Sequence, residues 1–429
     1  MIIILGGGLA GLSTGYHLRN DKYLILEKEN QVGGLCRSVN IKGYVFDYAP
    51  HIFFTRNDYV MNLVTNLLKN NLIKQIRKAY IYLKDTYVEY PFEVNLNGLP
   101  EDVIKECING VINRSKEKPR NFKEWIYTTF GEGIAKHYMI PYNEKIWKYD
   151  LSKMNIDWIS DRVPSPSVED MKKGAVGKLD KDFGPNAVFF YPKFGGIGAL
   201  AQSLAQSQST ISLNSEVIEI KHKKNETEIV YTKNNEMRKI NSKYVISSIP
   251  LPTLIKMFND VPEEVIKAAK SLVFNSLVCI NIGIKRPKIS EKNWIYFPEK
   301  DLIFNRISFP MNFSEFTTPR NRSSILIEVT HRRNEIDIEE IKEKVIDGLI
   351  TSKIIRESDK LDVCDVSQFK YAYVIYDLNH KKNVRTIHEF LKDNTIIPIG
   401  RYGEWKYLNM DKAILSGKNT AIELNEGSK

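Results

Sequence analysis

The chain of 429 residues has room for about two or three folded domains. Its 42% hydrophobic and 27% charged residues are typical of a globular protein and exclude a disordered, collagen-like or coiled-coil chain. The net charge of +10 admits three kinds of partner: nucleic acid, an anionic membrane surface, or an anionic small molecule.

The first thirty residues predict one βαβ unit. Residues 1–5 form an apolar run that is typical of a buried parallel strand, and residues 23–27 form a second run of the same kind. Between them, the glycine-rich segment 6–11 opens a helix that should end near Leu18. The apolar start lacks a basic segment and is interrupted by glycines, so we do not expect a signal peptide.

The remaining elements change character along the chain. Apolar residues at three-to-four spacing predict helices at residues 58–72, 100–114 and 121–137. Strands are then expected at 210–221, 226–232, 244–248, 277–283, 294–297, 324–329 and 396–399, with helices near 338–349 and 411–425. No apolar run reaches the roughly 18 residues of a membrane helix, so we expect a cytoplasmic protein that does not enter a membrane.

This order predicts an α/β fold with three parts. Residues 1–57, 191–275 and 390–429 would form a discontinuous Rossmann-like domain, and residues 58–160 a helical insert. Residues 161–190 with 276–389 would form an antiparallel sheet domain. The four cysteines show no CxxC and no paired Cys/His spacing, so we expect reduced thiols and no metal site.

The first motif is Gly6-x-Gly8-x-x-Gly11, which lies between a predicted strand and a predicted helix. In that context the glycines allow a tight turn, the approach of backbone N–H groups to a pyrophosphate, and close packing of helix on strand. Glu27 ends the second strand, where a carboxylate can accept hydrogen bonds from a ribose. The three glycines and Glu27 therefore predict dinucleotide binding.

A second glycine loop follows directly, with Gly33, Gly34, Arg37 and Ser38. It can give the same pyrophosphate a second cradle and a counter-charge. The order of these residues after Glu27 resembles the amine-oxidase-like and glutathione-reductase-like flavoproteins, which implies FAD as the cofactor of the Rossmann-like domain.

Later segments resemble the UDP-galactopyranose mutase family, with a mixture of bacterial-type and eukaryotic-type motifs. The segment 48–55 resembles the bacterial loop beside the flavin ring. The eukaryotic-type segments are Tyr90-Pro91-Phe92, 139–147, 158–162, 184–187, 294–298 with Arg306, and 400–407. The resemblance runs in order from Met1 to about Glu423.

The resemblance implies a role for each matched residue. Arg162 and Arg306 would clamp the diphosphate of a UDP-sugar, since a guanidinium can fork onto phosphate oxygens. Arg401 and His51 match residues at the flavin, and His51 joins the two arginines as a candidate catalytic residue. The candidate substrate-binding residues are Tyr90, Phe92, Asn143, Trp147, Asn186, Trp294, Tyr296, Tyr373, Tyr407 and Asn409.

The implied reaction is the interconversion of UDP-galactopyranose and UDP-galactofuranose, or of a closely related nucleotide hexose, for cell-surface glycan biosynthesis. In this family the N5 atom of reduced flavin forms a covalent adduct with the anomeric carbon. NAD(P)H is the candidate reductant, and the oligomeric state, a homo-oligomer included, stays open. The alternative is a net flavin oxidoreductase of the amine oxidase or protoporphyrinogen oxidase type, which would share the flavin motifs but needs no diphosphate clamp.

Two residues depart from the family pattern. Glu93 stands where the eukaryotic-type enzymes usually have Gln near the uracil, and an ionised acid can only accept hydrogen bonds. Ala49 replaces a glycine in the flavin loop. The basic runs of the chain are short and scattered, which argues against nucleic acid and membrane, so of the three partners the anionic small molecule is favoured.

Overall fold

A parallel sheet forms the Rossmann-like part of the fold. The computed structural model describes residues 1–18, 22–159, 167–177, 187–208, 210–223, 226–332 and 336–427. In this part of the chain the sheet has the order β19 (Ile396–Pro398), β13 (Tyr244–Ser247), β1 (Ile2–Leu5), β2 (Tyr23–Leu26), β9 (Ile211–Ser212), with parallel neighbours throughout. All four residues of β1 are buried, as expected for a strand covered on both faces.

Side chains of β1 alternate between two cores. Ile2 and Ile4 pack into a core shared with α1 (Leu9–His17), α2 (Asp58–Leu68), α7 (Gly198–Gln206) and α13 (Met410–Gly427). Ile3 and Leu5 pack on the other side, with α8 (Leu251–Leu254), α9 (Glu263–Ser271) and α11 (His380–Asp393). An antiparallel sheet of β10 (Ser215–Lys223), β11 (Glu226–Lys233) and β12 (Glu236–Ser242) adds to this second core.

A larger, mostly antiparallel sheet lies beside the parallel one. In the described chain its order is β18 (Leu361–Val374), β14 (Phe274–Ile284), β17 (Ser323–His331), β16 (Arg306–Ser308), β15 (Trp294–Tyr296), β6 (Ala79–Leu83), β7 (Thr86–Glu89). One face packs against α10 (Ile338–Thr351) through residues such as Ile280. Leu277 and Cys279 point to the opposite face, where they pack with Ala49 and Ala372.

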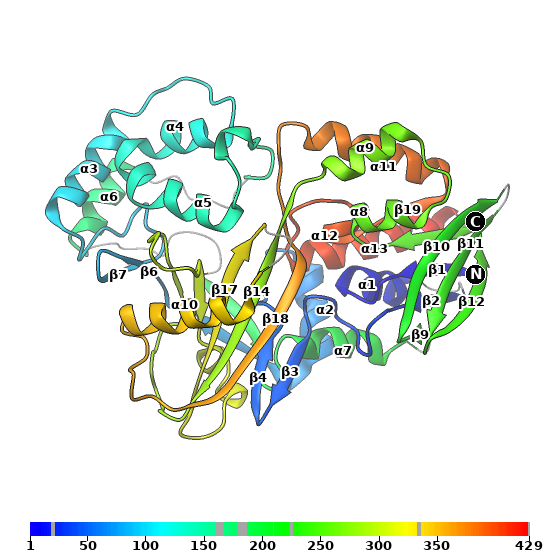
Figure 1. Ribbon diagram of the computed structural model, residues 1–429, viewed down its shortest axis with the longest axis horizontal. Coiled ribbons are helices and arrows are strands. Elements are labelled where there is room, and N and C mark those ends of the chain that lie inside the picture. Colours follow the sequence, from blue (N-terminus) through cyan, green and yellow to red (C-terminus); the bar gives the residue numbers. More distant parts are fainter. Residues whose placement is uncertain are drawn as a thin grey trace.

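The remaining helices form a separate lobe with its own core. They are α3 (Glu101–Ile112), α4 (Phe122–Ile134), the π-helical turn Ala135–Met139, α5 (Ile140–Trp147) and α6 (Val168–Ala175). As expected, α3 begins just after Pro100 with two acids in its first turn. Figure 1 shows this lobe at one end of the long axis and the N-terminus with β10–β12 at the other.

Two strand pairs and a one-turn helix connect these parts. β3 (Ser38–Ile41) pairs with β4 (Tyr44–Asp47), and β5 (Leu72–Ile76) pairs with β8 (Val188–Pro192). The one-turn helix α12 (Gly400–Gly403) follows β19. The predicted α/β class, with a parallel sheet, an antiparallel sheet and a helical lobe, is confirmed.

Two predictions of local structure are wrong. The single strand expected at 210–221 is divided into β9 and β10, which belong to different sheets, because the chain turns at Asn214 with a left-handed φ of 51°. The stretch 58–160 is not only helical, since it also supplies β5, β6 and β7. The division of the chain into three domains with the boundaries given above stays a prediction.

Candidate functional site

The turn between β1 and α1 has the geometry that the glycine motif predicts. Gly6 has a φ of +100°, which suits glycine. A Cβ at Gly11 would lie 2.0 Å from the Gly6 carbonyl oxygen, so the helix can pack this closely only with glycine there. A Cβ at Gly8 would meet nothing within 4 Å. Gly8 therefore faces open space, where the backbone can approach a ligand.

Glu27 is tied to the same turn. Its carboxylate accepts a hydrogen bond from Gly7 N at 2.7 Å and another from Glu29 N at 3.0 Å. Each carboxylate oxygen keeps a second lone pair, so Glu27 can still accept from a ribose hydroxyl. The predicted cofactor residues at β1 and β2 are thus brought together.

The second glycine loop lies against the first. Gly33 N donates to Gly7 O at 2.8 Å, and a Cβ at Gly34 would touch the Cα atom of Gly8 at 3.4 Å. Arg37 donates from Nε to Gly34 O at 2.8 Å and forms an ion pair with Glu29 at 3.2 Å. The two loops form one glycine-lined cradle with a guanidinium beside it.

Ser38, a predicted cofactor residue, forms hydrogen bonds within the protein. Its hydroxyl donates to the buried Asp47 at 2.6 Å and accepts from Gly198 N at 2.9 Å. Because its only hydrogen is used by Asp47, this hydroxyl cannot also donate to a phosphate. Ser38 connects β3 to α7 here, and its role at a cofactor stays a prediction.

Arg401 lies at the start of α12 among aromatic rings. Its guanidinium carbon is 4.5 Å from the Tyr407 ring centroid and 5.4 Å from that of Tyr373, and its Nη2 donates to Ala372 O at 2.9 Å. The Nε of Arg401 is buried and has no hydrogen-bond partner among the described residues. Such an unpaired buried donor is costly, and a bound group with an acceptor would satisfy it.

Tyr373 and Tyr407 connect Arg401 to the helical lobe. Their rings stack with centroids 6.0 Å apart, and both contact the ring of Trp147, at 5.9 and 6.1 Å. Burial and the nearby Glu328 raise the pKa of Tyr373, so its hydroxyl keeps its proton and can donate to an anion. Three predicted substrate residues and one predicted cofactor residue therefore form one cluster.

Arg306 is held in place by an acid on the neighbouring strand. The register places Tyr296, Arg306 and Glu328 side by side on β15, β16 and β17. Glu328 is 1% exposed and accepts hydrogen bonds from Nε and from Nη2 of Arg306, the latter at 3.0 Å. This fork fixes the guanidinium plane and leaves Nη1 for another acceptor.

His51 lies near both arginines. Burial, together with the charges of Arg401 and Arg306, lowers the pKa of His51 to about 4, against the opposing effect of a hydrogen bond with Ala49 O. That hydrogen bond, 2.7 Å long, joins Nδ1 to a carbonyl, so Nδ1 carries the proton of the neutral ring. Nε2 of His51 is then a hydrogen-bond acceptor at neutral pH.

Comparison with known protein families identifies the kind of site. The model of the flavin-containing amine oxidoreductases matches residues 9–425. The chain belongs to this family. Membership implies that the glycine cradle holds FAD, and the open space at Gly8 and the unpaired Nε of Arg401 both fit such a ligand.

Relatives within the family include mutases and oxidases. A crystal structure of reduced UDP-galactopyranose mutase matches 99% of this chain and 93% of its own, with a TM-score of 0.92 and 25% identity, which confirms the predicted resemblance. The L-amino acid oxidase bordonein-L of Crotalus durissus terrificus is 23% identical over 66% of this chain and 58% of its own. The dTDP-fucopyranose mutase of Escherichia coli is 26% identical over 34% of this chain and 41% of its own.

This chain spans about three fifths of the length of the L-amino acid oxidases that it matches. The shared features are therefore the fold and the flavin site. The activity, substrates and partners of the whole protein are therefore proposed below from the residues of this chain.

The other predicted substrate residues are distributed unevenly over this flavoprotein. Tyr90 and Tyr296 pack with ring centroids 5.4 Å apart. Asn143 accepts from Trp147 Nε1 at 2.9 Å, while Trp294 packs with Phe189 in the core beside the parallel sheet. Phe92 is fully buried, and Asn409 is exposed just before α13. Arg162 and Asn186 lie outside the described residues, so the two-arginine clamp stays a prediction.

Three residues of this site were not predicted from the sequence. Glu328 is the partner of Arg306, Tyr142 packs on Tyr296 at 5.4 Å, and Trp158 packs on Trp147 at 4.9 Å. Glu328 could not have been found, because its pairing with Arg306 depends on the register between β16 and β17. Tyr142 and Trp158 lie in the matched segments 139–147 and 158–162, but neither was named as a site residue.

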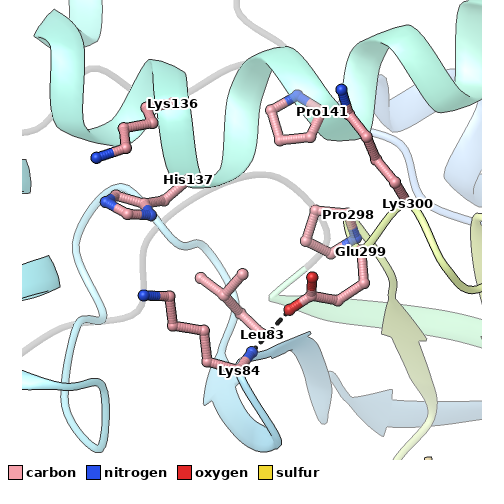
Figure 2. A pocket seen from close by; sticks show the side chains of 8 residues that line it. All are labelled: Leu83, Lys84, Lys136, His137, Pro141, Pro298, Glu299 and Lys300. Atoms are coloured by element: carbon pink, nitrogen blue, oxygen red, sulfur yellow. Dashed lines mark hydrogen bonds between the residues drawn. The ribbon is translucent and has the colours of Figure 1, made fainter.

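The helical lobe also has a pocket on another side of α5. The pocket has a volume of about 240 Å³. Its lining residues, drawn in Figure 2, are Leu83, Lys84, Lys136, His137, Pro141, Pro298, Glu299 and Lys300. Pro141 lies about 200° around the helix from Asn143, so the pocket and the predicted site use different faces of α5. Lys136 and His137 already contact Glu106, with their nitrogens 2.8 and 2.7 Å from its carboxylate.

Two features that mark other classes of protein are absent from the part of the chain that the structure describes. No group of three or more His, Cys, Asp and Glu side chains there could hold a metal ion. None of its helices is long and apolar enough to span a membrane.

Proposed function

We propose that this flavoprotein is a nucleotide-sugar mutase that interconverts UDP-galactopyranose and UDP-galactofuranose, or a closely related pair. The observation that carries the proposal is the fixed guanidinium of Arg306, which lies beside Tyr296 and close enough to interact electrostatically with Tyr373. A guanidinium held with Nη1 free, together with neutral hydroxyl donors, can bind the oxygens of a diphosphate. The match to a reduced UDP-galactopyranose mutase over almost the whole chain supports it.

Each group would have a defined task. Reduced FAD supplies the nucleophile for the anomeric carbon when it is bound. Arg306 would bind a phosphate oxygen through Nη1, because Glu328 already accepts from Nε and Nη2. Tyr373 and Tyr407 would donate to the same diphosphate, which stabilises the leaving UDP. Nε2 of His51 would accept a hydrogen bond at the edge of the flavin.

The second candidate is a net oxidation of an amine or amino acid, because the family and the L-amino acid oxidases support it. Arg306 would then pair with a carboxylate. An anaerobic assay separates the two. The dithionite-reduced protein is incubated with UDP-galactose, and the products are separated by chromatography. Formation of the furanose supports the mutase. In a second assay, the protein is aerated with a panel of amines and amino acids. Formation of hydrogen peroxide there, with no furanose in the first assay, would exclude the mutase.

A variant tests the role of Arg306 in this assay. We expect Arg306→Ala to lower turnover by about a hundredfold or more, the usual effect of removing one donor to a developing charge. Bound flavin should stay at the wild-type level. Arg385→Ala, at an exposed arginine of α11, is the matched control and should keep full turnover. Loss of flavin in Arg306→Ala would place this side chain at the cofactor instead.

A further inference from the structure

The chain that leads from α12 to Tyr407 turns sharply at residues 405–407. Trp405 is fully buried and has a φ of +54°, in the left-handed region that a bulky side chain rarely adopts. The next residue, Lys406, donates its backbone N–H to Arg401 O at 2.9 Å, so the turn brings the chain back to the start of α12. A conformation of this kind is strained and persists only where the surrounding structure holds it.

Two side chains hold the 405–407 turn. Nε2 of His380, at the start of α11, donates its N–H to Trp405 O at 2.9 Å. The hydroxyl of Tyr376 accepts the backbone N–H of Tyr407 at 3.0 Å. The rings of Tyr376 and His380 stack on each other, with centroids 4.0 Å apart and planes 16° apart. One aromatic pair therefore holds the two backbone groups that flank Lys406.

The segment that carries this pair, residues 375–380, is itself fixed to the helical lobe. Asn155 N donates to Tyr376 O at 2.8 Å, and Asn155 Nδ2 donates to Asp377 O at 3.0 Å. Met154, which belongs to the core of the lobe, forms an isolated β-bridge with Asp377. The aromatic pair thus connects the lobe to the turn that bears Tyr407.

Tyr407 is the residue whose position this arrangement decides. Its ring contacts those of Tyr373 and Trp147 and lies 4.5 Å from the guanidinium carbon of Arg401. Its hydroxyl is a proposed donor to the diphosphate of the substrate. A donor that is fixed before the reaction meets the developing charge without reorganisation, whereas a donor on a relaxed turn would occupy several positions.

We infer that Tyr376 and His380 are positioning residues for the proposed reaction, which hold the 405–407 turn so that the Tyr407 hydroxyl reaches the diphosphate. This inference rests on the proposed function, because the two side chains act through a residue that the mutase reaction would use. Both lie outside the segments that resemble the mutase family, so the sequence motifs assign them no role.

The test is a cycle of variants, measured as furanose formation by the flavin-loaded, dithionite-reduced protein. Tyr376→Phe keeps the ring that stacks on His380 and removes the oxygen that accepts from Tyr407 N. We expect kcat to fall by about tenfold, the value of one hydrogen bond, and KM to change by less than about twofold, because the positioned hydroxyl acts mainly on the leaving UDP. In a Tyr407→Phe background, which lacks that hydroxyl, Tyr376→Phe should lower kcat by less than about twofold further.

His380 is tested by two variants of similar size. His380→Gln retains an N–H that can donate to Trp405 O, whereas His380→Leu has no donor, so kcat should be at least about fivefold higher in the Gln variant. Tyr371→Phe is the matched control. Tyr371 lies on β18, packs on the Trp405 ring and bonds through its hydroxyl to Thr253 at 2.9 Å, so this variant should keep full turnover.

Bound flavin at the wild-type level shows that each variant is folded. Full turnover in Tyr376→Phe, or an equal loss with and without the Tyr407 hydroxyl, would overturn the inference and leave the mutase intact. Equal kcat values in the two His380 variants, or a loss in Tyr371→Phe as large as that in Tyr376→Phe, would also overturn it, since the effect would then come from packing around Trp405. If the wild type forms no furanose, the proposed function itself fails.

Discussion

At the scale of single residues, the proposed chemistry depends most on the ion pair between Arg306 and Glu328. Glu328→Gln keeps the shape of the side chain but leaves the guanidinium without its counter-charge. We expect the free energy of unfolding to fall by about 3 kcal/mol, the lower end for breaking a buried pair, because Arg306 is partly exposed. Urea unfolding measures this, with Glu340→Gln of the exposed pair with Lys344 as the control, where less than about 1 kcal/mol should be lost.

A double variant shows whether the loss comes from the pair. In Arg306→Met with Glu328→Gln, neither charge is left unpaired, so the destabilisation should be clearly smaller than the sum of the two single variants. Additive losses would mean that Glu328 stabilises the strand by some other contact.

His51 gives the site a dependence on pH. Its folded pKa of about 4 lies below the ordinary value of 6.5, so the unfolded chain binds the proton first. Stability from the neutral ring is therefore complete above about pH 6.5 and is lost as pH falls towards about 4. Between about pH 6.5 and about pH 4, His51→Gln should therefore lose about 2 kcal/mol less unfolding free energy than the wild type. This figure is smaller than the one that the whole pKa shift would give, because the ring is partly exposed.

The exposed His222 provides the control for this measurement. His222→Gln should leave the profile between about pH 4 and about pH 6.5 unchanged, because this side chain is exposed and lies outside the site. A profile of His51→Gln that is parallel to the wild type would show that folding does not change the pKa of His51.

At the scale of elements, the β1–α1 turn contains one glycine that the fold requires, Gly11, and one that ligand binding requires, Gly8. Gly11→Ala would push a methyl group into the Gly6 carbonyl, so we expect the flavin-free protein to lose about 2 kcal/mol or more. Gly8 has a φ of −74° and open space at its Cβ, so Gly8→Ala should leave the flavin-free fold unchanged. It should weaken FAD binding by at least about tenfold, because the methyl group keeps the pyrophosphate from the backbone.

Thermal unfolding of the flavin-free variants and flavin absorbance after reconstitution measure the two effects. Normal flavin content in Gly8→Ala would mean that the pyrophosphate lies elsewhere. An unchanged melting temperature in Gly11→Ala would mean that the turn relaxes.

The sequence predicts those elements whose stability is decided locally. The apolar run of β1, the glycine turn and the Pro100 start of α3 depend on neighbouring residues, and all three are confirmed. The long strand β18 was not predicted, because its exposed and buried residues do not alternate regularly. The split into β9 and β10 depends on which sheet each half joins, which no local pattern contains.

The same limit holds for the site. Residues in specific motifs, such as Arg306, Tyr373 and Arg401, could be predicted, and the structure places the last two together. The partner of Arg306 could not be, because its identity depends on the register between β16 and β17. Residues of the lobe such as Tyr142 join the site only through the packing of α5 beside β15.

At the scale of the whole molecule, the residues predicted to bind the flavin lie where the two large sheets meet. Arg401 follows the last parallel strand and donates to Ala372 of β18. A Cβ at Gly400 would lie 2.6 Å from the Cβ of Ala10 in α1, so the end of the chain packs closely on its beginning. The loop that bears Ala49 and His51 packs on β14 and β17 of the antiparallel sheet. A ligand in the glycine cradle and against Arg401 would therefore contact both sheets.

Removal of the flavin should thus affect the stability of the whole molecule and not of one lobe. At about a thousand times its Kd, FAD would add about 4 kcal/mol to the free energy of unfolding. We expect the flavin-free protein to melt several degrees lower in scanning calorimetry, and added FAD to raise the entire transition. If only one of two separate transitions rises, the cofactor contacts the parallel sheet alone. The contacts of Arg401 with β18 would then be structural, and the reacting part of the flavin would have to lie away from Arg306.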